Sequence, residues 1–168
     1  MANISVLRKQ CLALDDENYR NVHRRTIFDR SHSIGNYKAI TKGRYFFNWK
    51  SEKGKEVFKL RIIETNEFLG LISIERIPEE WRIHIRLLTV SIENMGKHKK
   101  YERIVGNLLT HVAKIAVLEF GELACISLRP KSSIARHYVE RYCMNITGMT
   151  LSMEVEEILN LINEYDND

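Results

Sequence analysis

The stretch KHKKYERIVGNLL, residues 97–109, gathers basic side chains just before a helical apolar pattern. The first backbone N–H groups of a helix have no partner within the helix and carry the positive end of its dipole, so this end favours an anion. Gly96 gives the preceding loop room to turn. The stretch is therefore either a solvated basic loop or a phosphate site formed with Lys97, Lys99, Lys100 and Arg103. Taken alone, it favours the solvated loop.

Three consecutive segments upstream are predicted to be β-strands, and the first and third of them show period-two alternation. They are residues 57–64, 68–76 and 81–92, joined by short polar turns, so an antiparallel meander is expected. In the third segment, strict alternation predicts one face formed by Trp81, Ile83, Ile85, Leu87 and Thr89, and the other by Arg82, His84, Arg86, Leu88, Val90 and Ile92.

The apolar spacing then changes to that of a helix, from Tyr101 to Phe120, and Gly121 predicts its end. The continuously apolar LACISL, residues 123–128, is typical of a buried strand. The strand 81–92, the helix and the strand 123–128 form a βαβ unit, so these two strands should be parallel. The carboxyl ends of such strands open a crevice for a ligand.

The remaining elements are less regular. Asp15 can cap a helix whose inner face holds Tyr19, Val22, Thr26 and Ile27, and residues 31–56 are expected to be mostly loop. Ser132 or Ser133 is expected to cap a further helix. TGMTLSME, residues 147–154, predicts a last strand, and VEEILNLINEY, residues 155–165, predicts an amphipathic helix. We therefore expect an α/β (α+β) fold with a mixed central sheet and flanking helices.

Length and composition limit the class of protein. The 168 residues are 44% hydrophobic, which fits one domain with a real core, and the net charge of +4 suits an anionic ligand. The absence of an 18-residue apolar run and of a signal-peptide core predicts a cytoplasmic protein outside the membrane. No HxxxH or HExxH pair supports a metal site. We expect reduced cysteines, with Cys125 and Cys143 as small core residues and Cys11 unpaired.

Residues 57–153 resemble the GNAT superfamily of acyl-CoA-dependent N-acetyltransferases. In that family a strand leads through a Q/R-x-x-G-x-G/A loop to a long helix, a strand, and a helix of the form N-x-x-A-x-x-x-Y-x-x-x-G-F. Here these parts are RLLTVSI, KYERIVG and SSIARHYVERYCM, followed by GMTLSMEV. A bacterial branch with a longer loop, N-K-K-Y-x-G-V-A-G-x-L, and a downstream H-Y-E-x-x-Y-G is similar to HKKYERIVGNLL and RHYVERYCM.

The resemblance implies one GNAT domain over residues 1–168. Residues 1–56 would shape the acceptor side, residues 57–153 would bind acyl-CoA, and residues 154–168 would form the C-terminal helix. Acetyl-CoA is the implied cosubstrate, and no metal is expected. Backbone groups of Val90 and Ile92 should pair with pantetheine as an added strand would. The other expected cofactor contacts are Lys97, Lys99, Lys100, Tyr101, Arg103, Ile104, Val105, Gly106 and Ser132.

Two positions depart from the family's loop. Arg103 stands where the family has its first glycine, and Val105 stands at the small residue. Because backbone N–H groups of this loop bind the pyrophosphate in the family, the Arg103 side chain can either crowd the phosphate or contact it. The family's Gly-Phe is replaced by Cys143-Met144.

Acetyl transfer to an amine requires a base for the amine proton, a donor for the oxyanion and a proton for the leaving thiolate. The family supplies a tyrosine for the thiolate. Without a gap this position falls on Val139, and with one extra residue, as in the bacterial branch, it falls on Tyr138, which we take as the general acid. His84, on the predicted Val90 face, is the first candidate base and Glu75 the second. Tyr138 could instead be a packed core aromatic, and His84 and Glu75 could be solvated polar residues of the sheet without a catalytic role.

We therefore expect an N-acetyltransferase that moves an acetyl group directly to a primary amine of a small molecule or peptide, with a homodimer as an expectation taken from the family. A catalytically inactive module that binds acyl-CoA or a protein is the alternative, and Arg103 and Val105 favour it. Nucleic-acid binding ranks last because no aromatic residues are interleaved with the basic residues Arg20, Arg24, Arg25 and Lys97–Lys100.

Overall fold

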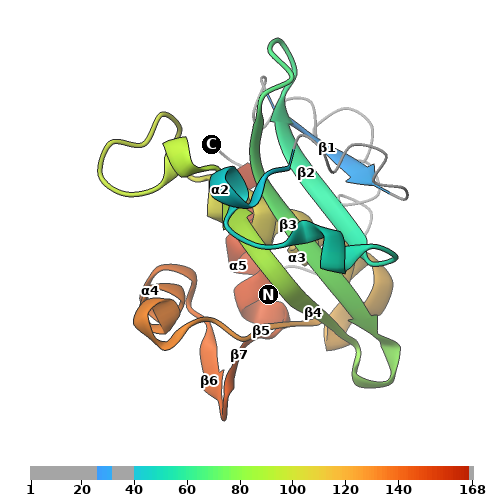
Figure 1. Cartoon of the computed structure of the whole chain (residues 1–168). Helices are drawn as coiled ribbons and strands as arrows, with labels where there is room; N and C mark the ends of the chain where they lie inside the picture. Colours follow the sequence, from blue (N-terminus) through green and yellow to red (C-terminus); the bar gives the residue numbers. More distant parts are fainter. Residues whose placement is uncertain (1–25, 32–39, 167–168) are drawn as a thin grey trace.

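A computed structural model describes residues 26–31 and 40–166 of the chain, with the backbone alone for 26–31. The described strands form one mixed sheet of seven, in the order β1-β2-β3-β4-β5-β7-β6 (Figure 1). The strands are β1 Thr26–Ser31, β2 Glu56–Ile62, β3 Phe68–Ile77, β4 Arg82–Val90, β5 Cys125–Leu128, β6 Asn145–Thr147 and β7 Thr150–Met153. The helices are α2 Lys42–Tyr45, α3 Ile104–Phe120, α4 Ser132–Tyr142 and α5 Val155–Asp166, with short 3₁₀ turns at η2 Trp49–Glu52, η3 Pro78–Glu80, η4 Ile92–Asn94 and η5 Gly121–Leu123.

The expected α/β fold is confirmed. Strands β2, β3 and β4 form the antiparallel meander. Strands β4 and β5, which α3 connects, pair in parallel, and β7 is antiparallel to β5. Helix α3 ends at Gly121, which has a φ of 61°, as the sequence predicts.

Two predicted elements are wrong. Thr26 and Ile27 lie in β1, paired with Ile62 and Arg61 of β2, and not in a helix that begins at Asp15. Both are β-branched, which favours a strand. Asp15, Tyr19 and Val22 lie outside the described residues, as do Cys11, Arg20, Arg24 and Arg25.

The predicted last strand, residues 147–154, is a hairpin. Thr147 pairs with Thr150 around a two-residue turn, in which Gly148 has a φ of 66°. Glycine reaches this left-handed region without strain, so the chain reverses there and the apolar run divides into β6 and β7.

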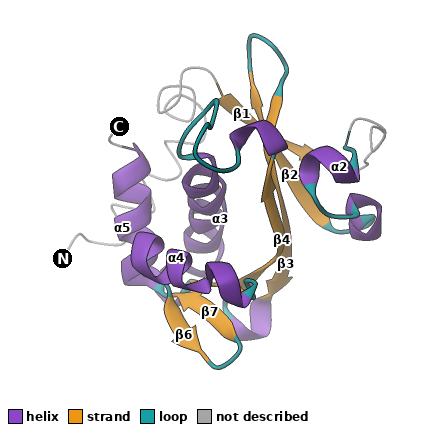
Figure 2. Ribbon diagram, turned by 60° about the vertical axis from the view of Figure 1, so that its left-hand side comes forward, coloured by secondary structure: helices purple, strands orange, loops and turns teal. Residues whose placement is uncertain are grey.

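The main core lies between the sheet and helices α3 and α5, while α2 lies on the opposite face (Figure 2). Helix α3 lies close against the sheet at Gly70, where an added Cβ would come 2.9 Å from Leu108 Cδ1 and 3.1 Å from Ile104 Cγ2. The second cluster, on the α2 face, contains Ile40, Tyr45, Trp49, Val57 and Leu71.

Residues Ile104–Leu123 have the length and hydropathy of a membrane-spanning helix, but 61% of an apolar 18-residue window within them is buried inside the protein. Burial of this kind is typical of the core helix of a folded domain, and the contacts of α3 with the sheet and α5 agree with that interpretation.

A β-bulge interrupts β4 at Arg86. Ser73 pairs with Leu87 and Ile74 pairs with Ile85, so Arg86 has no counterpart on β3. One extra residue reverses the alternation of every side chain beyond it. The predicted faces of β4 are therefore wrong beyond Ile85: Leu88 and Val90 join Ile83 and Ile85 on the α3 face, whereas Leu87 packs against the second cluster. His84 consequently does not share a face with Val90.

Glu52 of η2 is a buried carboxylate beside this bulge. Ser73 Oγ donates a hydrogen bond to Glu52 Oε2 at 2.6 Å, and Arg86 Nε donates to the same oxygen at 2.9 Å. Burial opposes ionisation of Glu52, but the hydrogen bonds from Arg86 and Ser73 outweigh it and lower its pKa below the usual 4.5.

We expect stability to fall with pH below about 4.5, because a carboxylate with a lowered pKa contributes its stability above the unfolded pKa and loses it as the pH falls through the folded pKa. Replacement of Glu52 by Gln should cost about 1–3 kcal/mol at pH 7 and weaken that pH dependence. Urea unfolding at pH 7 and pH 4 measures both effects, with Glu79→Gln, at an exposed position, as the control. An equal loss for the two variants at pH 7 would contradict this account of Glu52.

Candidate active site

A cleft opens where β4 and β5 part. The two strands pair from Arg82 and Cys125 to Ile85 and Leu128, after which β4 continues to Val90 with only β3 beside it among the described strands. A cavity of about 610 Å³ lies at this position. The edge of β4 beyond Ile85 therefore offers backbone N–H and C=O groups to a ligand in the cavity.

The cavity is lined by the carboxyl half of β4, the first turn of α3, one face of α4, the segment after α2, Met95 and residues 128–131 from the end of β5 to α4. The side chains that come from α3, α4 and the segment after α2 include Phe46, Phe47, Val105, Ile134, His137 and Tyr138. The aromatic patch at 45–49 is thus divided between core and cleft, because Tyr45 and Trp49 are buried in the second cluster.

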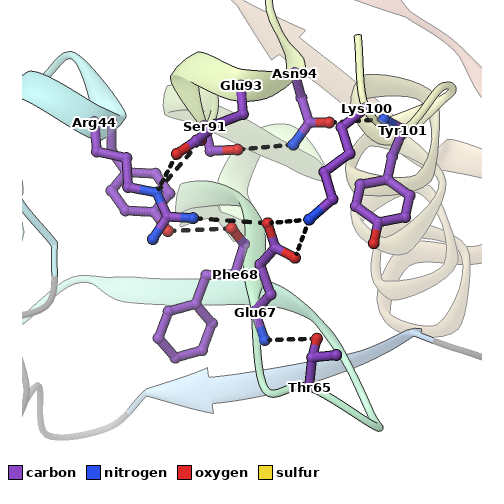
Figure 3. Close-up of polar contacts among 10 residues, drawn as sticks. Arg44, Thr65, Glu67, Phe68, Ser91, Glu93, Asn94, Lys100 and Tyr101 are labelled. Atoms are coloured by element: carbon purple, nitrogen blue, oxygen red, sulfur yellow. Dashed lines mark hydrogen bonds and ion pairs between the residues drawn. The ribbon is translucent and has the colours of Figure 1, made fainter.

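A buried asparagine holds the basic loop in shape (Figure 3). Asn94 Nδ2 donates to Ser91 Oγ at 2.8 Å, and Asn94 Oδ1 accepts the Tyr101 backbone N–H at 2.8 Å. The Lys100 N–H also bonds to the Glu93 carbonyl at 3.3 Å. These bonds close the base of the loop over residues 94–101. Sequence reasoning missed Asn94, since an asparagine in a polar loop gives no sign of burial.

Ion pairs fix the same loop to two other elements (Figure 3). Lys100 Nζ lies 2.9 Å from an oxygen of Glu67 in the β2–β3 turn, and this hydrogen bond raises the pKa of Lys100. Arg44 of α2 lies 3.1 Å from Glu93 and 3.8 Å from Glu67. Lys100 is thus engaged with a carboxylate, whereas Lys97 and Lys99 are exposed on the loop.

Arg103 occupies the backbone conformation of a glycine. Its φ is 64°, in the left-handed region, which agrees with its alignment to the first glycine of the family's loop. Its side chain lies against α5, with the guanidinium carbon 4.3 Å from the centre of the Tyr165 ring and Nη2 3.4 Å from Glu164 Oε1. In this conformation the Arg103 side chain is directed to α5 and does not line the cleft.

The other predicted cofactor contacts divide into two groups. Val90 and Val105 line the cleft. The others lie outside its lining. Ile92 and Ser132 are exposed, Tyr101 packs on the core and Ile104 is buried in it. Gly106 is also outside the lining. An added Cβ at Gly106 would lie 2.0 Å from Tyr165 Cζ, so this glycine serves the contact of α3 with α5. Ser133, one residue after the predicted Ser132, lines the cleft instead.

Two observations on helix α4 favour different alignments of the tyrosine. Cys143 follows α4 with a φ of 53° and is exposed, so it occupies the place of the family's glycine and not the predicted core position. That register assigns Val139 to the family's tyrosine, yet Val139 packs on the core while Tyr138 lines the cleft. The predicted serine cap is also wrong: Lys131 precedes the helix, and its extended backbone leaves Ser132 as the first helical residue.

Tyr138 is 8% exposed, and burial raises the pKa of its hydroxyl above the usual 10. The phenol therefore keeps its proton through the neutral range, as a general acid must. His137, which also lines the cleft, was missed by the sequence analysis. Its position follows only from the orientation of α4.

His84 lies on the face of β4 away from α3, outside the cleft lining. Its Nδ1 is 2.8 Å from Ser127 Oγ, which accepts a hydrogen bond from Arg82 Nη1 at 2.6 Å. Since Arg82 can only donate, the serine hydroxyl is left to donate to Nδ1. Burial, followed by the charge of Arg82, lowers the pKa of His84, so its imidazole is neutral at pH 7. Ser127 is a partner that the sequence did not reveal.

Glu75 pairs with His84 across β3 and β4, and its carboxylate is bound by Lys55 at 3.1 Å and Arg86 at 3.3 Å. The hydrogen bond from Lys55 lowers its pKa, which makes the carboxylate a weaker base. The structure thus brings Glu75 and His84 together, but it does not bring either into the cleft with Tyr138.

No group of three or more His, Cys, Asp or Glu side chains that could hold a metal ion occurs within residues 26–31 and 40–166. Cys125 is half-buried, and burial raises the pKa of its thiol.

No protein-family model and no curated protein matches the sequence. Solved structures do match the fold. IAA acetyltransferase from Bacillus cereus aligns with a TM-score of 0.56 and 11% identity, over 77% of this chain and 99% of that one. A mutant spermidine N-acetyltransferase from Vibrio cholerae gives 0.59 and 10%, over 82% and 98%. A GNAT family acetyltransferase from Elizabethkingia anophelis, with acetyl-CoA bound, gives 0.57 and 14%, over 77% and 98%.

The chain therefore has the GNAT fold, as the loop and helix motifs predicted. At identities of this size the likeness concerns the fold, and the chemistry has to be argued from this chain's own residues.

Proposed function

We propose that the protein is an acetyl-CoA-dependent N-acetyltransferase that transfers the acetyl group directly to a primary amine. The observation that carries the proposal is the parting of β4 and β5 beyond Ile85 and Leu128, which opens a cavity of about 610 Å³ between a free strand edge and α4. A structure with the same fold holds acetyl-CoA, which supports the choice of cosubstrate.

In this proposal the cofactor's amide-bearing arm lies along the edge of β4, and its phosphates lie at the loop before α3. Val90 and Val105 would contact the arm, and Lys97 and Lys99 would add positive charge near the phosphates. The first backbone N–H groups of α3 would donate hydrogen bonds to these phosphates. The Asn94 bonds hold the loop closed before any ligand binds, which reduces the entropy lost on binding.

The transfer requires two proton movements. The amine nitrogen attacks the thioester carbon, a C–N bond forms, and the C–S bond then breaks. Tyr138 would give its proton to the leaving thiolate. His137 lies on the cleft wall and can take the amine proton, whereas His84 and Glu75, outside the lining, would act only through water. Because Tyr138 is nearly buried, a hydrogen bond from its hydroxyl to the thiolate would be stronger than in water.

We expect Val105→Glu to weaken acetyl-CoA binding by at least tenfold, because the new carboxylate would stand at the helix start where the phosphates should lie. Calorimetric titration with acetyl-CoA and with CoA measures this loss. Lys53→Glu, an exposed substitution away from the cleft, makes a matched control that should bind normally. Failure of the unaltered protein to bind either compound would disprove the proposal.

A catalytically inactive acyl-CoA-binding module is the second candidate, and one observation favours it. Both bases expected from the sequence, His84 and Glu75, lie outside the cleft lining. Tight acetyl-CoA binding without release of CoA in the presence of any amine would support this candidate over the enzyme.

A further inference from the structure

The charged side chains that line the cleft are all positive in the part of the chain that the structure describes. Among the described residues that line it, Arg86, Arg129 and Lys131 are cationic, and no carboxylate belongs to the lining. This bias concerns the part of the cleft that would receive the acceptor, so its chemistry bears on which amine can be bound.

The three cations are not equivalent. Arg86 donates to the buried Glu52 at 2.9 Å and to Glu75 at 3.3 Å, so its charge is compensated within the protein. Arg129 Nη2 instead lies 3.9 Å from the sulfur of Met149. Lys131 Nζ lies 4.3 Å from the centre of the Phe46 ring. Within the described part of the chain neither Arg129 nor Lys131 forms an ion pair with a carboxylate.

Position along the strands separates Arg129 from the phosphate end of the cleft. Arg129 directly follows Leu128, the last residue of β5 that pairs with β4, so it stands where the strands part. The loop before α3 follows Val90, five residues beyond Ile85, which corresponds to roughly 16 Å of strand. Lys131 comes two residues after Arg129, and the contact of its ammonium with the Phe46 ring places it across the cleft, toward the segment after α2.

We infer that the acceptor is an amine that carries a carboxylate, and that Arg129 and Lys131 bind this carboxylate. The inference rests on the proposed acetyltransferase function and names its substrate class. An arginine and a carboxylate form strong, charge-assisted hydrogen bonds, and a partly enclosed cleft strengthens them. A polyamine would instead bring positive charge beside Arg129 and Lys131, which have no carboxylate partner among the described residues, and this is unfavourable.

Matched pairs of amines test the inference. L-phenylalanine with 2-phenylethylamine, and L-lysine with cadaverine, differ only in the carboxylate, and release of CoA from acetyl-CoA reports the transfer. We expect kcat/KM to be at least tenfold higher for the carboxylated member of each active pair. Arg129→Gln and Lys131→Gln should each reduce this ratio about tenfold or more, and Lys53→Gln should leave it unchanged.

The affinity for acetyl-CoA, measured by calorimetry on the same proteins, distinguishes the acceptor from the cofactor. It should stay within about twofold of the parent in both cleft variants. A large loss of acetyl-CoA affinity would mean that these cations hold the cofactor, and would overturn the inference. An equal or reversed preference within the pairs would also overturn it, with the enzyme still active. No CoA release with any amine, despite intact binding, would overturn the proposed function and this inference together.

Discussion

Replacement of Tyr138 by Phe is expected to lower kcat for acetyl transfer by roughly 100-fold. The hydroxyl is the proton source proposed for the leaving thiolate, and its pKa is raised by burial, so it is protonated throughout the neutral range. Removal of one oxygen at the cleft wall should change the affinity for acetyl-CoA little. Steady-state kinetics of CoA release, with calorimetry for the cofactor, give the two quantities separately.

The matched control is Tyr142→Phe, one turn further along α4. Tyr142 is 8% exposed like Tyr138, and its ring centre is 5.9 Å from that of Tyr138, but it does not line the cleft. A purely structural effect of losing a buried hydroxyl should affect both variants. The acid role of Tyr138 would be refuted by a kcat that is the same in the parent and Y138F, or that falls equally in Y138F and Y142F.

Gly106→Ala is expected to have the largest effect on stability, a loss of about 3 kcal/mol or more. A Cβ at this position would lie 2.0 Å from Tyr165 Cζ and 2.5 Å from Tyr165 Cε1, so either the ring or the whole of α5 must move. Tyr165 is 1% exposed and belongs to the main core, where packing is close, so a shift of its ring must displace its neighbours. Urea unfolding at pH 7 measures the loss.

Gly43→Ala gives the matched control for that experiment. Gly43 lies in α2, and an added Cβ would have nothing within 4 Å. Alanine costs less entropy than glycine in a helix, so this change should stabilise the protein by roughly 0.5–1 kcal/mol. If both alanine variants changed stability by less than about 1 kcal/mol, the close contact between Gly106 and Tyr165 would be incorrect.

The local patterns of the sequence predicted the elements that build the cleft. The apolar strand-like segments at residues 57–64 and 68–76, separated by a short polar turn, predicted two strands of the meander, and apolar spacing up to Phe120 with Gly121 predicted α3. The motif alignment also placed Arg103 at a glycine position, and its left-handed φ agrees with that. Each of these features depends on residues close to one another in the chain, where propensity and period act directly.

The site itself depended on contacts between distant residues. Because of the bulge at Arg86, His84 and Val90 lie on opposite faces of β4. The bulge arises from the pairing of β4 with β3, so no pattern within β4 alone predicts it. The side chain of Arg103 was expected near a phosphate, but Glu164 and Tyr165, about sixty residues later, bind it.

The sequence alone thus determined that the chain builds a mixed sheet with a βαβ crossover, because periodicity and turn residues specify elements and short connections limit their order. The tertiary structure alone decided which side chains meet in the cleft. It turned His137, Arg129 and Lys131 toward the cavity and bound Glu75 to Lys55 outside it. The direction of a side chain is set by the packing of its whole element, and that packing minimises the free energy of residues far apart in the sequence.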